Sequence, residues 1–81
     1  MKAIENNLKA ALDTMDVPEG RKEPTIANLR WLQRNLFIRN QNHRELPFAI
    51  HMIATLLTLM GENPSATWGN NEKEAAEDVG H

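Results

Sequence analysis

The chain has 81 residues, enough for one small domain, because two independent cores would need roughly 100 residues or more. It contains no cysteine, which excludes disulfides, thiolate metal sites and a cysteine nucleophile. Nine basic and eleven acidic side chains give a formal net charge of −2. The chain as a whole is therefore not a polycation of the kind that binds nucleic acid through phosphates alone.

A first helix is predicted over about residues 2–16. Its apolar residues recur at helical spacing and form one narrow stripe: Ile4, Leu8, Ala11, Leu12 and Met15. We expect this helix to end near Asp16, because Pro18 disfavours helix at Val17 and Gly20 permits a turn. The helix should lie on the surface with one face buried.

A second helix is predicted over about residues 24–40, opened by Pro24 in its first turn or by Thr25 as its N-cap. One face holds Ile26, Leu29, Leu32, Leu36 and Phe37. A second apolar group, Ala27, Trp31 and Ile38, lies well away from that face, with Arg30 and Arg34 between the two groups. A helix with one core face does not need this second group.

A third helix is predicted over about residues 46–60, with Pro47 in its first turn and Gly61 as its stop signal. Apolar residues cover nearly its whole circumference, and only His51, Thr55 and Thr58 form a thin polar stripe. A helix of this kind must be central to its core. We expect His51 to be a partly buried structural histidine bonded to a backbone carbonyl or to Thr55, the alternative being a pH-sensitive interface switch.

The fold class predicted is therefore all-α, with three helices in a domain over residues 1–63 and the third helix central. Residues 64–81 are polar and acidic, and we expect a disordered tail there. Trp68 is the exception in that tail and is expected to dock on the core or to belong to an interface. No secretory signal and no apolar run of membrane-spanning length occur, so a cytoplasmic location is expected.

The three helices carry more apolar surface than they can hide from water. Most of the third helix is apolar, and Trp31 and Ile38 add to the excess. Each large apolar side chain left in water forgoes roughly 1.5–3 kcal/mol of burial. We therefore expect a homodimer that pairs the third helix, the second helix or both, and a different partner protein would resolve the excess equally well.

The sequence offers no signature of catalysis. It lacks the His spacings of common zinc sites, the glycine-rich loops that hold nucleotides, and a serine with a histidine nearby in sequence. We expect no enzyme activity, no catalytic residue, no cofactor and no metal.

Charge is unevenly distributed along the chain. Residues 21–44 hold six basic side chains against Glu23 alone: Arg21, Lys22, Arg30, Arg34, Arg39 and Arg44. They either solvate the second helix and pair with acidic neighbours, or contact the phosphates of a nucleic acid. A helix-turn-helix does not fit, because the third helix would have to read DNA and has no basic residue.

In size and composition the chain is similar to many small accessory proteins of phages and mobile elements. The favoured hypothesis is a small non-enzymatic regulator or inhibitor that binds another protein. Its contact residues would be Arg30, Trp31, Arg34 and Ile38, which are of the types that dominate interface hot spots or extend them. The alternative is a nucleic-acid-associated protein that uses the basic segment 21–44.

Overall fold

The computed structural model describes residues 1–64 and is all-α over that range, as predicted. Three α-helices follow in chain order: α1 (Lys2–Leu12), α2 (Ile26–Arg39) and α3 (Leu46–Leu59). A short 3₁₀ turn, η1 (Glu19–Arg21), lies in the connection between α1 and α2. The predicted tail, its disorder and the docking of Trp68 concern residues that lie outside the described range.

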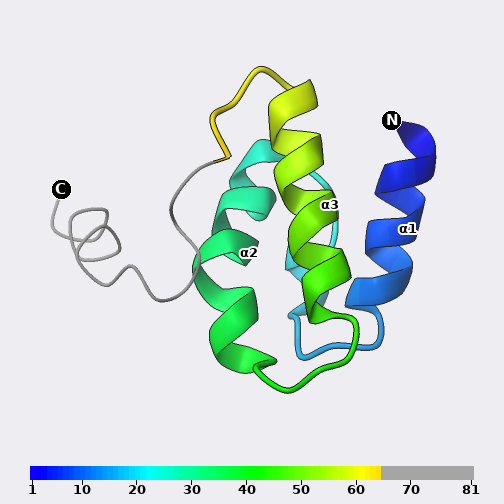
Figure 1. The fold of residues 1–81 in the computed structure, drawn as a ribbon, viewed down its shortest axis with the longest axis vertical. Coiled ribbons are helices and arrows are strands. Elements are labelled where there is room, and N and C mark those ends of the chain that lie inside the picture. Colours follow the sequence, from blue (N-terminus) through cyan, green and yellow to red (C-terminus); the bar gives the residue numbers. More distant parts are fainter. Residues whose placement is uncertain (65–81) are drawn as a thin grey trace, which may run out of the picture.

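Helix α3 is the centre of the fold, as its wide apolar circumference predicted. It packs against both α1 and α2, which flank it in Figure 1. Its buried residues are Leu46, Ala49, Met52, Ile53, Leu56 and Leu57. The flanking helices add Leu8, Ala11 and Leu12 from α1 and Leu29, Leu32 and Leu36 from α2. Burial of such side chains, at roughly 1.5–3 kcal/mol each, is the main force that holds the three helices together.

Helix α1 ends at Leu12, four residues before the predicted end near Asp16. Near and beyond that point, polar side chains form hydrogen bonds with backbone groups. The Thr14 hydroxyl donates to the Ala11 carbonyl at 2.7 Å, and the Asp16 N–H donates to Asn40 Oδ1 at 2.8 Å. Helix is therefore replaced by turns, because short polar side chains compete with the helical hydrogen bonds.

Helix α2 starts at Ile26, with Thr25 as its N-cap: the Thr25 hydroxyl accepts from the Asn28 N–H at 3.1 Å. Pro24 therefore lies outside the helix. The core face differs from the predicted one, because Ile26 is 42% exposed and Phe37 is 38% exposed, while Gln33 is fully buried. The buried face is therefore narrower than predicted: it keeps Leu29, Leu32 and Leu36, and Gln33 forms its edge on the side where Ile26 and Phe37 are exposed.

The chain beyond α3 returns along α2 and explains the burial of Gln33. Gln33 Nε2 donates to the Pro64 carbonyl at 2.7 Å, and Arg30 Nη1 donates to Gln33 Oε1 at 2.9 Å. Arg30 Nη2 also reaches Glu62 Oε1 at 3.2 Å. The segment after α3 is thus held against α2 as far as Pro64.

Candidate functional site

The outward stripe of α2 contains three of the four residues predicted to contact a partner. Trp31, Arg34 and Ile38 are spaced i, i+3 and i+7 and lie on the side of α2 turned away from its buried leucines. Ile38 is 55% exposed. Trp31 and Arg34 are partly buried, and Trp31 packs against the edge of the core. This stripe therefore presents an aliphatic side chain beside a partly covered indole.

Two guanidinium groups lie over the indole of Trp31. The Cζ of Arg21, at the end of η1, is 5.2 Å from the ring centroid, and the Cζ of Arg39, at the end of α2, is 5.5 Å from it. Both distances are within the range of cation–π attraction, worth about 0.5–1 kcal/mol at an exposed site. Arg21, Trp31 and Arg39 are called the Trp31 cluster below.

The two arginines of the Trp31 cluster are held by residues outside it. Arg21 Nη1 donates to Asn28 Oδ1 at 3.4 Å, and Arg39 Nε donates to Asp16 Oδ2 at 3.4 Å. The first contact is partly buried and the second is an exposed ion pair. Both restrict the guanidinium groups, and three N–H donors or more of each arginine remain for another ligand.

Arg30 does not join the Trp31 cluster, although the sequence placed the two residues together. Its guanidinium bonds to Gln33 and Glu62, and its side chain is 26% exposed. Arg30 thus fixes the segment after α3 against α2. Adjacent positions on a helix point about 100° apart, which is why Arg30 and Trp31 serve different neighbours.

Two further basic residues of segment 21–44 differ in their ion pairs: Lys22 has two acidic partners, and Arg44 has none among residues 1–64. Lys22 Nζ lies 3.1 Å from both Asp13 Oδ1 and Glu19 Oε1, and its side chain is 16% exposed. The hydrogen bond to Glu19, and then that to Asp13, raises the pKa of Lys22 above its usual value. Arg44 is exposed and has no ion-pair partner among residues 1–64.

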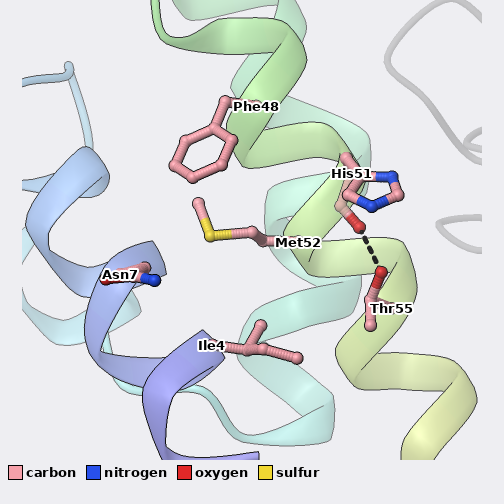
Figure 2. Close-up of a pocket in the computed structure, with 6 residues that line it drawn as sticks. All are labelled: Ile4, Asn7, Phe48, His51, Met52 and Thr55. Carbon is pink, nitrogen blue, oxygen red and sulfur yellow. Dashed lines mark hydrogen bonds between the residues drawn. The ribbon is translucent and has the colours of Figure 1, made fainter.

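A second surface lies between α1 and α3, and sequence reasoning did not single it out. Figure 2 shows its first hollow, with Ile4 and Asn7 on α1 and Phe48 and Met52 on α3 bordering the space between the helices. This hollow has a volume of about 210 Å³ and is lined by Ile4, Asn7, Phe48, His51, Met52 and Thr55. This hollow and a second one beside it, with the residues of α1 and α3 that line them, are called the Phe48 groove below.

Phe48 separates the first hollow from a second one. The second has a volume of about 390 Å³ and is lined by Asn7, Ala10, Ala11, Thr14, Glu45 and Phe48. Phe48 is 50% exposed, although it belongs to the central helix. The signal in the sequence was the short side chains of Asn7 and Ala10, which cannot cover an aromatic ring on the neighbouring helix.

His51 lies at the edge of this groove and corrects a prediction. It is exposed rather than partly buried, and in Figure 2 its ring points away from Phe48. Its backbone carbonyl accepts a bond from the Thr55 hydroxyl at 2.9 Å, whereas the bond expected was one of the imidazole. The polar stripe of α3 faces water.

No group of three or more His, Cys, Asp or Glu side chains among residues 1–64 could hold a metal ion. No helix in the same part of the chain is long and apolar enough to cross a membrane.

Comparisons with known proteins give no relative: no family model, no curated protein and no solved structure matches this chain.

Proposed function

We propose that this protein is a small non-enzymatic regulator or inhibitor that binds another protein through the outer face of α2. The observation that carries the proposal is the Trp31 cluster, in which two guanidinium groups lie over one indole, beside the exposed Ile38. Tryptophan and arginine are the residue types that dominate interface hot spots. A role in a phage or mobile element, and a cytoplasmic location, belong to the same proposal and rest on the sequence.

The chemistry of this face defines the partner. Guanidinium groups favour carboxylates, which they bind through paired N–H donors, while Ile38 and the indole favour an apolar side chain. The ligand is therefore an acidic segment of a protein that also presents an apolar residue. Because Asn28 and Asp16 already restrain Arg21 and Arg39, less side-chain entropy is lost when the ligand binds.

The alternative, a nucleic acid bound through the basic segment, has less support. Arg21, Lys22, Arg30 and Arg39 each have an intramolecular partner. Lys22 and Arg30, which lie outside the Trp31 cluster, are ion-paired with Asp13, Glu19 and Glu62, so fewer of the six basic side chains remain for phosphates. We expect no salt-sensitive rise in the fluorescence anisotropy of labelled mixed-sequence DNA or RNA between about 50 and 200 mM salt, where several phosphate contacts would change affinity by orders of magnitude.

A photo-crosslinking amino acid placed at Ile38 tests the proposal in cells that naturally make the protein. We expect the photoproduct to contain a second, different polypeptide, which mass spectrometry identifies. Thr58 is the matched control, because it is exposed on the polar stripe of α3 and lies in neither hollow. Adducts that are no more abundant at position 38 than at position 58 would contradict binding through α2.

The identified partner then allows the two functions to be separated with charge variants. Arg39→Gln removes a guanidinium from the Trp31 cluster, whereas Arg44→Gln removes an exposed arginine outside it. Binding of a protein to the cluster should weaken with Arg39→Gln and not with Arg44→Gln. Equal losses from both variants, together with a steep salt dependence, would favour phosphate binding instead.

A further inference from the structure

We propose that the Phe48 groove is a self-association surface, in which Phe48 of each copy enters the first hollow of a second copy. This proposal is independent of the partner proposed for α2, because it uses α1 and α3 only. Its occupant is a second copy of this chain.

The first hollow has the size and lining that a phenyl ring requires. Its volume is about 210 Å³. An apolar cavity of about 150 Å³ is sufficient to bind benzene. Ile4 and Met52 border the space, and the methionine sulfur adds a favourable contact with an aromatic ring. A phenylalanine side chain from outside would therefore find both room and apolar neighbours.

The same face supplies the ring that the hollow accepts. Phe48 is half exposed and borders the hollow, and Met52 follows it by one helical turn. In a two-fold symmetric dimer, residue i of one copy contacts residue j of the other and the reverse contact forms as well. With a two-fold axis between Phe48 and the first hollow, the ring of each copy enters the hollow of the other. The two α3 helices then cross in opposite directions.

Charge also favours a second copy over a charged partner. None of the residues that line the first hollow is Lys, Arg, Asp or Glu, and the second hollow adds Glu45 alone. Two copies of this surface can approach without bringing rows of like charges together. A strongly charged ligand would find no complementary partners here, in contrast to the outer face of α2.

Sedimentation equilibrium of the full chain over about 1–200 µM tests the proposal, since that range covers micromolar dissociation constants. We expect a mass that rises from 9.2 kDa toward twice that value. Phe48→Ala should raise the dissociation constant by at least about 30-fold, the loss expected of a hot-spot aromatic. Leu59→Ala is the matched control: Leu59 is 54% exposed on the same helix but lies in neither hollow, and its variant should dimerise normally.

A second measurement locates the contact without a substitution. In dimers mixed from labelled and unlabelled chains, we expect intermolecular NOEs between the Phe48 ring of one copy and the methyl groups of Ile4 and Met52 of the other. A monomeric mass at every concentration would overturn the proposal. So would a dimer that survives Phe48→Ala, or one whose intermolecular NOEs come from Ile38 on α2.

Discussion

The outer face of α2 and the Phe48 groove are both partly apolar, but they are built in different ways. The face of α2 combines one indole with guanidinium groups held from two directions, by Asn28 and by Asp16. The groove has no lysine or arginine in its lining and holds a half-exposed phenylalanine beside a hollow of about 210 Å³.

This difference separates two tasks in one small chain. Charge complementarity chooses among partners, because like charges repel and unpaired charges cost free energy. Phe48 and the first hollow beside it include no lysine, arginine or carboxylate that could select a partner by charge. The ring of one copy can, however, fill the hollow of another copy. We therefore assign recognition of another protein to α2 and self-association to the groove.

Both surfaces depend on the shared core of α3, and the largest expected effect comes from there. Ile53 is fully buried on the central helix. Ile53→Ala should lower the free energy of unfolding by about 2–5 kcal/mol, measured by chemical denaturation. Both surfaces should be lost together as the protein unfolds. A variant as stable as the wild-type protein would show that α3 does not organise the core.

A smaller effect is expected from Asn40, which supports α2 and leaves the groove alone. Its amide joins the end of α2 to the backbone of Asp16, the residue that restrains Arg39. Asn40→Ala should cost about 1–3 kcal/mol of stability, because the Asp16 N–H loses its acceptor. Under conditions in which the variant is folded, its dissociation constant for dimerisation should equal that of the wild-type protein. A dimer that weakens in parallel would contradict the separation of the two surfaces.

The Trp31 cluster itself should contribute less to stability. Arg39→Gln removes one cation–π contact and is expected to cost about 0.5–1 kcal/mol. Trp31 fluorescence, observed in a Trp68→Phe background, should shift to the red as the indole loses cover. Leu59→Ala in the same background is the control and should leave the spectrum unchanged. An unchanged spectrum in Arg39→Gln would mean that the guanidinium does not rest on the indole.

The smallest expected effect is a pH dependence of stability that arises at Lys22, the residue after Arg21 of the Trp31 cluster. Its hydrogen bonds to Glu19 and Asp13 raise its pKa in the folded protein above the unfolded value. The stabilisation is therefore fully present below the ordinary lysine pKa of about 10.4 and is lost as pH rises through the higher folded value. Lys22→Met should thus be less stable than the wild-type protein at about pH 8, and this difference should shrink as the pH rises beyond the ordinary lysine pKa of about 10.4. Lys2→Met, at an exposed site, should show no such change; a Lys22 penalty that persists at high pH would exclude the ion pairs as its source.

The central position of α3 could be predicted from the sequence because apolar residues cover nearly its whole circumference. The N-cap at Thr25 and the stop at Gly61, whose φ is 81°, were also local signals. The early end of α1 could not be predicted, since Asn40, which binds the Asp16 N–H, lies 24 residues further along the chain. Burial of Gln33 likewise depends on Pro64, which arrives from beyond α3.

The candidate surfaces show the same limit. A helical wheel grouped Trp31 with Ile38 and placed Arg34 between that group and the core face, and in the structure the three residues share the outward side of α2. The wheel could not show that Arg21, from η1, and Arg39, from the end of α2, both lie over the indole, or that Arg30 turns to Glu62. The Phe48 groove was missed because it depends on which residues of α1 lie opposite α3, and that pairing is a property of the fold.

The most direct test of the two-surface assignment is a dilution series followed by methyl NMR, with isoleucine and methionine methyl groups labelled in the wild-type protein. Ile4 and Met52 report on the groove, and Ile38 reports on the outer face of α2. Between about 200 and 1 µM, a range chosen for a micromolar dimer, we predict that the Ile4 and Met52 signals shift while the Ile38 signal stays in place. An Ile38 signal that moves with the other two, or three signals that do not move at all, would contradict the assignment.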